Sequence, residues 1–196
     1  MKEYHRHSIR LKGYDYSQSG AYFITINTLN RAPLFGEIAD GIMHPNRFGR
    51  IVCECWDSIT EHFANVELDE FVAMPDHVHG IVLILAKPDV VDKQIDVGAR
   101  RAVPLQNVVS SQNHKSQREQ FGKPTCASIP TIIRSFKSAA TKRINEEQDS
   151  SGCPVWQRNY YEHIIRDDGE LNRIRQYIHD NPANWISDGE EPKFHL

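Results

Sequence analysis

Two histidines separated by one residue, His77 and His79, are the first residues whose type and spacing can do chemistry. On a strand, residues two apart point to the same face, with Cβ atoms roughly 6 to 7 Å apart. Two imidazoles at that separation can bind one metal ion. Such a pair alone is more often structural, with both rings on a polar sheet face. The setting favours a metal site, because a Pro75-Asp76 turn leads into an apolar strand.

A second candidate pair, Tyr177 and Asn181, lies at the end of the last predicted helix. Four residues of helix separate the two side chains by about 40° around the axis and about 6 Å along it. An amide oxygen and a phenol so placed can address one ion and its substrate. Two histidine nitrogens, one asparagine oxygen and open positions suit Mg²⁺ or Mn²⁺ bound together with a phosphate. The alternative is a packed tyrosine followed by a helix-end asparagine.

The histidines are expected on the second strand of a tight antiparallel pair. Residues 66–73 and 77–85 both have the composition of strands, and three residues separate them. Val78 is expected to point away from the histidines, into the core. Gly80 has no side chain that would crowd the site.

Another strand is predicted at residues 21–30, which follow Gly20 and are rich in aromatic and β-branched side chains. Residues 34–38 are expected to pair with this strand across a turn at 30–33. A helix is predicted at residues 47–63, where apolar residues recur every four positions.

Residues 131–145 predict an amphipathic helix with a basic exterior, and residues 155–165 an extended segment. Asp167, with a glutamate three residues later, resembles a capping box that opens the last helix. That helix is expected to stop at Asn181-Pro182, because the residue before a proline is disfavoured in the helical region.

Residues 87–130 are polar, contain prolines and show no sustained period, which indicates a long flexible surface insertion. The remaining elements run strand, helix, strand, strand, helix, strand, helix. This order predicts one α+β domain over residues 1–196, with an antiparallel sheet and helices packed on it. A ferredoxin-like α/β sandwich with a C-terminal tyrosine-bearing helix is the simplest arrangement of this kind.

Composition places the chain among soluble globular proteins. Its 196 residues suit one domain, and 39% are apolar and 25% charged. No apolar run approaches the roughly 18 residues of a membrane span. The charged N-terminus lacks a secretory signal, so we expect a cytoplasmic protein with no membrane partner. The four cysteines are not spaced as zinc ligands.

The net charge of −3 conceals two basic runs, one at the N-terminus and one in the helix predicted at 131–145. A basic stretch with few acidic residues can bind nucleic-acid phosphates, although a solvated charged face is the alternative. The candidate DNA-binding residues are Arg6, Arg10, Lys12, Arg134, Lys137 and Arg143.

The segment Met74-Pro-Asp-His-Val-His-Gly-Ile-Val, followed by Tyr177-Ile-His-Asp-Asn-Pro, resembles the HUH single-tyrosine transposases. The chain is most similar to their branch called REP-associated tyrosine transposases. Shorter matching segments are RLKGYDY at 10–16, GAYFIT at 20–25, SFK at 135–137 and VWQRNYYEHIIR at 155–166. The resemblance runs from about residue 6 to 185, apart from the insertion.

The resemblance implies that His77 and His79 are metal ligands, Asn181 the third ligand and Tyr177 the nucleophile. Proteins of this family cut one DNA strand near an imperfect hairpin and become linked to its 5′ phosphate. The chain would then be a metal-dependent endonuclease and strand transferase that acts at REP-like palindromes, in DNA transposition or in processing of these elements. Single-stranded DNA hairpins are the implied partner, and Arg10 is a candidate reader of the flanking bases.

Other side chains compete for roles at the site. Tyr160 and Tyr161 are alternative nucleophiles, but they alternate faces and neither has an amide one helical turn away. His163 is a candidate general base. Trp156 and Gln157 are expected to support packing or to contact DNA.

Two alternative functions that involve DNA stay open, and a third, a metal-binding structural domain unrelated to DNA, would leave both basic runs unexplained. One is a replication-initiator or relaxase-type HUH nuclease, which usually has a third metal-binding histidine. The other is a hairpin-binding protein that has lost catalysis. We expect a monomer, with a homodimer as the alternative.

Overall fold

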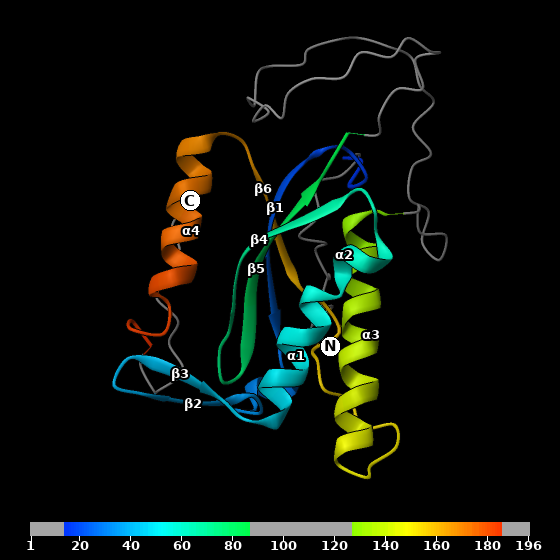
Figure 1. The fold of residues 1–196 in the computed structure, drawn as a ribbon, viewed down its shortest axis with the longest axis vertical. Helices are drawn as coiled ribbons and strands as arrows, with labels where there is room; N and C mark the ends of the chain where they lie inside the picture. The colour runs from blue at the N-terminus through cyan, green and yellow to red at the C-terminus, as the bar shows by residue number, and fades with distance from the viewer. Residues whose placement is uncertain (1–13, 87–126, 186–196) are drawn as a thin grey trace, which may run out of the picture.

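A four-stranded antiparallel sheet forms the centre of the protein. The computed structural model describes residues 14–86 and 127–185. The strands are β1 (Gly20–Asn27), β4 (Val66–Ala73), β5 (His77–Ile84) and β6 (Tyr161–Ile165), in the order β4-β5-β1-β6 (Figure 1). The two central strands, β1 and β5, pair along their whole length.

Helices cover both faces of this sheet. On one side lie α1 (Arg47–Asp57), the single-turn α2 (Ile59–His62) and α3 (Ile129–Glu147), and on the other lies α4 (Asp168–Asp180) (Figure 1). The order of elements and of strands is that of a ferredoxin-like sandwich with one additional helix. The predicted α+β fold, an antiparallel sheet with helices packed on it, is therefore confirmed.

The alternation of side chains along β1 explains why helices must cover both faces of the sheet. Tyr22 and Ile24 are fully buried in the core beneath α1 and α3, whereas Phe23 is buried against α4. Successive side chains of a strand point to opposite faces, so an apolar run such as this one must be buried on both. Ile174 and Ile178 supply the matching apolar side of α4.

The helix predicted at residues 47–63 is divided at Ser58 into α1 and α2. It begins where the Asn46 side chain accepts hydrogen bonds from the backbone N–H groups of Phe48, at 2.8 Å, and Gly49, at 3.1 Å. Asn46 thereby satisfies two of the N–H groups that every helix start leaves unpaired.

The prediction that residues 34–38 pair with β1 is wrong. Both edges of β1 are occupied, by β5 and by β6, so no further strand can join it. The chain instead crosses to the β4–β5 turn, where Phe35 is fully buried and its N–H donates to Pro75 O at 3.0 Å. It then forms a separate hairpin from β2 (Gly36–Ala39) and β3 (Ile42–Pro45).

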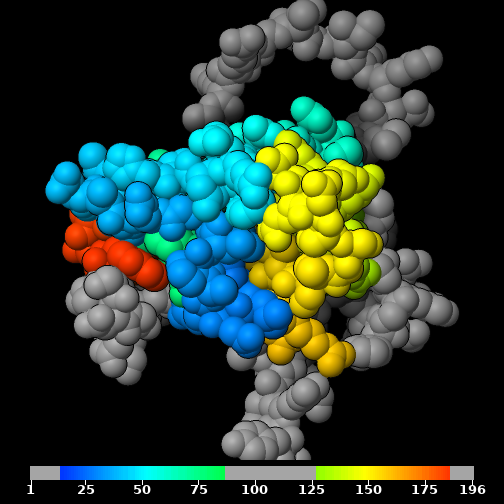
Figure 2. All heavy atoms as spheres, turned by 90° about the horizontal axis from the view of Figure 1, so that it is seen from below, coloured from blue at the N-terminus to red at the C-terminus, as the bar shows by residue number. Residues whose placement is uncertain are grey.

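This β2–β3 hairpin lies beside the segment that follows α4 (Figure 2). A Cβ atom built on Gly41, at the hairpin turn, would lie 3.4 Å from Cα of Ala183. The hairpin thus borders the end of α4, where the candidate asparagine lies.

Several predicted segments lie outside the described residues. They include the N-terminal basic run and most of the predicted insertion, because residues 1–13 and 87–126 are not described. The end of that predicted insertion is helical, since α3 begins at Ile129.

Within the described part of the chain, no helix is long and apolar enough to cross a membrane.

Gly80 has a different role from the one expected. It points away from the histidines, and a Cβ atom there would lie 2.4 Å from Cζ2 of Trp56 and 2.8 Å from its Cη2. Trp56 is 1% exposed and stacks on Phe71 with ring centroids 4.7 Å apart. Glycine at position 80 therefore lets α1 pack closely on the strand that carries the histidines.

We expect Gly80→Ala to destabilise the protein by about 2–3 kcal/mol, because the added methyl group overpacks the contact with Trp56. Urea denaturation measures the change. The variant Trp56→Phe removes the two clashing ring atoms, so the double variant should lose less stability than the sum of the single losses. An unchanged midpoint for Gly80→Ala would contradict this packing.

Candidate functional site

His77 and His79 lie side by side on the α4 face of the sheet. Both are buried, with 0% and 2% of their surface exposed. Their Nε2 atoms are 3.1 Å apart, and their ring centroids are separated by 4.5 Å. Val78, between them, is buried on the opposite face as predicted. The period of two in β5 therefore brings two imidazoles together in a dry setting.

The outer nitrogen of each ring has a hydrogen-bond partner. His77 Nδ1 donates to Asp76 Oδ1 at 2.6 Å, because an ionised carboxylate can only accept. His79 Nδ1 lies 2.8 Å from the hydroxyl of Thr25, its cross-strand neighbour in β1. Asp76 in turn lies 3.4 Å from a guanidinium nitrogen of Arg31. Such partners fix the rotation of an imidazole and direct its other nitrogen inward.

The environment favours neutral imidazole at His79. Burial, followed by the nearby His77 and Arg31 charges, holds the pKa of His79 well below its usual range. A neutral ring keeps a lone pair for a metal ion, which a protonated ring does not have.

Tyr177 reaches the same point from α4. Its hydroxyl lies 3.4 Å from His79 Nε2, and the two ring centroids are 5.3 Å apart. The tyrosine ring and that of Phe23 form a T-shaped pair with centroids 6.1 Å apart. The side chain is half-buried, so one side remains accessible from solvent.

Hydrogen bonds on both sides hold α4 in this position, and those on one side belong to an ion pair. Arg175 binds Asp69 of β4 through two hydrogen bonds of 2.9 and 2.5 Å. On the opposite side, Glu170 accepts from His163 of β6 at 2.8 Å and from the Arg166 N–H at 2.7 Å. Asp167 caps the helix through the Glu170 N–H at 2.8 Å, as predicted.

Asn181 follows α4 directly and is 3% exposed. Its Nδ2 atom is buried and has no hydrogen-bond partner among the described residues. The chain continues to Trp185, whose ring lies 5.7 Å from that of His77. Along the chain, Asn181 therefore lies between Tyr177, which contacts His79, and Trp185, which contacts His77. Its role as the third ligand stays a prediction.

The two imidazoles fit a divalent cation. An octahedral ion with bonds of about 2.1 Å places adjacent ligand atoms about 3.0 Å apart, close to the 3.1 Å between the Nε2 atoms. The described residues contain no group of three or more His, Cys, Asp or Glu side chains that could hold a metal. Mg²⁺ and Mn²⁺ also accept neutral oxygen ligands, including amide and substrate oxygens.

The two alternative tyrosines lie further from the pair. Tyr161 pairs with Thr25 across the strands and is 42% exposed. Burial and the Glu170 charge raise the pKa of its phenol, which disfavours the phenolate. Tyr160 packs against the core on the opposite side of the sheet. Of these two, only Tyr161 shares a face with the histidines.

Three other predicted residues serve the fold. Nε2 of His163 is hydrogen-bonded to Glu170. This contact gives no support to a role of His163 as a general base, and that role stays a prediction. Trp156 is 6% exposed and packs on Phe35 and Phe136, so it is a core residue. The N–H of Gln157 donates to Asn27 O at 2.9 Å and ties this segment to β1.

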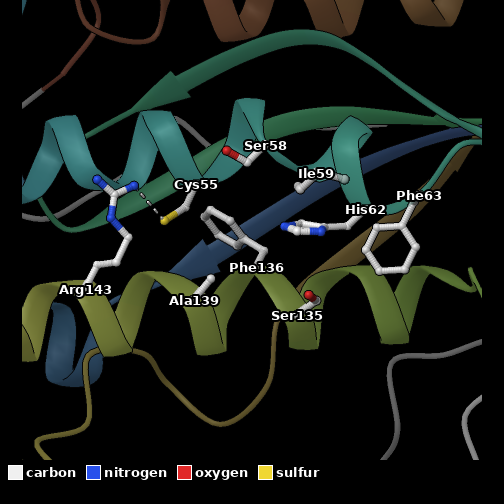
Figure 3. Close-up of a pocket in the computed structure, with 9 residues that line it drawn as sticks. All are labelled: Cys55, Ser58, Ile59, His62, Phe63, Ser135, Phe136, Ala139 and Arg143. Atoms are coloured by element: carbon white, nitrogen blue, oxygen red, sulfur yellow. Dashed lines mark hydrogen bonds between the residues drawn. The ribbon is translucent and has the colours of Figure 1, made fainter.

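The basic residues of α3 differ in their surroundings. Lys137 donates to the carbonyl oxygens of Gln157 and Arg158, at 2.5 and 3.3 Å, and burial lowers its pKa to about 8. Arg143 binds Glu54 and lies against Cys55 in a pocket between α1, α2 and α3 (Figure 3). Arg134 is exposed. Contact of these residues with DNA stays a prediction, as it does for Arg6, Arg10 and Lys12, which lie outside the described residues.

Sequence reasoning missed Thr25 and Arg31 and did not assign a role to Asp76. Thr25 becomes relevant only through the strand register that places it opposite His79. Asp76 carried a signal, since a carboxylate that precedes a metal-binding histidine at a strand start is a natural partner for its Nδ1 atom.

The chain is 40% identical over 185 residues to an uncharacterized protein of Haemophilus influenzae, a match that covers 94% of this chain and 92% of the relative. The chain belongs to the same family as that protein. No family model matches the chain. Among solved structures, it resembles a REP-associated tyrosine transposase bound to a REP hairpin, with a TM-score of 0.51 and 17% identity, over 95% of this chain and 76% of that one. This likeness shows a shared fold.

Removal of the Asp69 carboxylate charge is expected to loosen α4. Arg175 holds the pKa of Asp69 below its usual range, so the stabilisation is complete above the unfolded value of about 3.9 and is lost as pH falls through the folded value. Asp69→Asn should therefore cost about 1 kcal/mol at pH 6, and less below pH 4.

Urea denaturation at pH 6 and pH 3 measures this difference. Asp57→Asn, which removes an exposed charge from α1, is the control and should follow the wild type at both pH values. An Asp69→Asn penalty that is equally large at pH 3 would show that the ion pair is not its cause.

Proposed function

We propose that this protein is a metal-dependent endonuclease and strand transferase that acts on single-stranded DNA at hairpins. The observation that carries the proposal is the contact between Tyr177 and the histidine pair. Its hydroxyl lies 3.4 Å from His79 Nε2, which is itself 3.1 Å from His77 Nε2. The hydroxyl of α4 that would act as the nucleophile thus lies beside the two histidine nitrogens of β5 that would hold the cation.

The histidines and Asn181 would hold a Mg²⁺ or Mn²⁺ ion, which when bound would neutralise charge on the scissile phosphate and stabilise the leaving oxygen. A free phenol has a pKa of about 10 and is a weak nucleophile at neutral pH. The packing of Tyr177 on Phe23 and His79 restricts its ring, so the hydroxyl is presented in one direction. Orientation of this kind is a large part of catalysis between bound groups.

The reaction exchanges one phosphodiester for another. The oxygen of Tyr177 forms a bond to phosphorus while the bond from phosphorus to the 3′ oxygen breaks. The phenol proton passes to water and the 3′ oxygen takes up a proton, so the products are a 5′-phosphotyrosine and a 3′ hydroxyl. The bond energy is conserved, and a second 3′ hydroxyl can reverse the step without ATP.

Two observations support hairpin DNA as the substrate. The solved structure with the same fold is of a REP-associated tyrosine transposase bound to a REP hairpin. The exposed Arg134 on α3 is available for phosphate contacts. REP-like palindromes, in transposition or in processing of these elements, are therefore the proposed targets.

Within residues 14–86 and 127–185, no third histidine completes a metal-binding group with the pair, as it would in an initiator or relaxase-type nuclease. His163 is bonded to Glu170, and His179 lies on the exposed side of α4, where its ring bonds Asp180 at 2.9 Å. Neither belongs to the described pair. The contact of Tyr177 with His79 within one chain also supports an active monomer, because the site needs no second copy.

The proposal predicts a covalent adduct with DNA. The tyrosine becomes linked to the 5′ phosphate of the downstream DNA fragment, and the upstream fragment is released. The hairpin oligonucleotide is therefore labelled at its 3′ end, so that the label stays with the protein. With Mn²⁺ or Mg²⁺, the wild type should form a labelled protein–DNA species on a denaturing gel, and EDTA should abolish it. Tyr177→Phe should form none, because it lacks the attacking oxygen.

Tyr161→Phe is the matched control, since it removes a phenol from the same sheet face and should keep the adduct. If Tyr177→Phe forms the adduct and Tyr161→Phe does not, Tyr161 is the nucleophile. If the wild type binds the hairpin but forms no adduct with either ion, the catalytic proposal fails and a hairpin-binding function remains.

A further inference from the structure

Asn27 is the last residue of β1 and lies directly opposite His77 in the register of β1 with β5. Directly opposed residues of an antiparallel pair have Cβ atoms about 4.5–5.5 Å apart. Alternation along β1 puts its side chain on the same face as Phe23 and Thr25, which contact α4 and His79. Asn27 is therefore an immediate neighbour of the histidine pair.

The side-chain oxygen of Asn27 is chemically unused in the fold. Within the part of the chain that the structure describes, Asn27 Oδ1 is buried and accepts no hydrogen bond. A buried acceptor without a donor is unfavourable, and most such groups in proteins are satisfied. Thr25, two residues earlier on the same face, does have a partner in His79. The fold alone does not explain an amide at position 27.

A second unused amide lies near the pair. Asn181 Nδ2 is also buried without a partner among the described residues. A half-turn of this amide exchanges its nitrogen and oxygen. The outer nitrogens of both histidines, by contrast, are bonded to Asp76 and to Thr25. One unsatisfied amide thus lies opposite His77 in the strand register, and the other directly follows the helix whose Tyr177 contacts His79.

We propose that Asn27 is a further ligand of the cation site, with Oδ1 as an oxygen donor beside His77. The inference rests on the proposed function, because it concerns the same divalent ion. Mg²⁺ and Mn²⁺ favour oxygen donors and six positions. Two imidazoles and two amide oxygens leave two positions for phosphate oxygens or water.

The test measures binding of Mn²⁺ alone to the full chain, by the loss of the free-ion electron paramagnetic resonance signal. Asn27→Leu keeps the side-chain size and removes the oxygen, so it should weaken Mn²⁺ binding at least about tenfold. Its unfolding temperature without metal should not fall, because no hydrogen bond is lost. Asn27→Asp supplies a charged oxygen and should bind Mn²⁺ more tightly than the wild type.

Asn145→Leu is the matched control. Asn145 is another buried amide with an unpartnered Oδ1, but it lies on α3, on the opposite side of the sheet. Its substitution removes the bond from Nδ2 to Cys153 O at 3.1 Å and should lower the unfolding temperature without a change in Mn²⁺ affinity.

The outcomes separate the two proposals. If the wild type binds Mn²⁺ and Asn27→Leu binds it equally well, Asn27 is not a ligand, while the proposed function stands. If Asn27→Asp binds no more tightly than Asn27→Leu, the ligand role also fails, because a carboxylate oxygen at a ligand position must restore binding. If the wild type binds no Mn²⁺, both the cation site and this inference fall.

Discussion

The packing of α4 across the sheet is the interaction on which the rest of the site depends. Tyr177 reaches His79 only because Ile174 and Ile178, about one turn apart on the apolar side of α4, are buried against Phe23 and Ile81. Burial of such side chains contributes roughly 1.5–3 kcal/mol each and drives the docking. It is not directional, however. The ion pair at Asp69 and the hydrogen bond at His163 limit how far the helix can slide or rotate, and the hydroxyl position depends on that restriction.

The burial of this sheet face also determines the protonation of His79 and the orientation of both imidazoles. In water, two histidines two residues apart titrate near pH 6.5 and rotate freely. Here burial disfavours the protonated form of His79, and the bonds to Asp76 and Thr25 orient both rings. The result is a pair of Nε2 atoms 3.1 Å apart, and the asparagine opposite His77 has a buried side-chain oxygen that the described fold leaves unsatisfied. A protein interior tolerates such groups when a ligand can satisfy them.

The wrong expectations have one cause, which is competition for space that only the assembled fold reveals. The segment at 34–38 has the composition of a strand, but β5 and β6 occupy both edges of β1. Gly80 looked like a residue that leaves room for a metal, yet its missing side chain makes room for Trp56 on the other face. Lys137 and Arg143 also have partners within the chain that the sequence did not show, while their contact with DNA stays a prediction. Each residue type was informative, but its neighbour was not visible in the sequence.

The sequence by itself determined the elements and the candidate chemistry, because both are encoded locally. Strand alternation, helical periodicity and caps depend on residues within a few positions of one another, so β4, β5, α3 and α4 were predictable nearly to their ends. The spacing of His77 and His79 likewise guarantees a shared face. What only the tertiary structure decided is which distant groups meet there. Thr25 and Asn27 reach the pair through strand register. Tyr177, whose role only the family resemblance implied, reaches it through helix docking. Register and docking both follow from the packing of the whole core, which no local pattern contains.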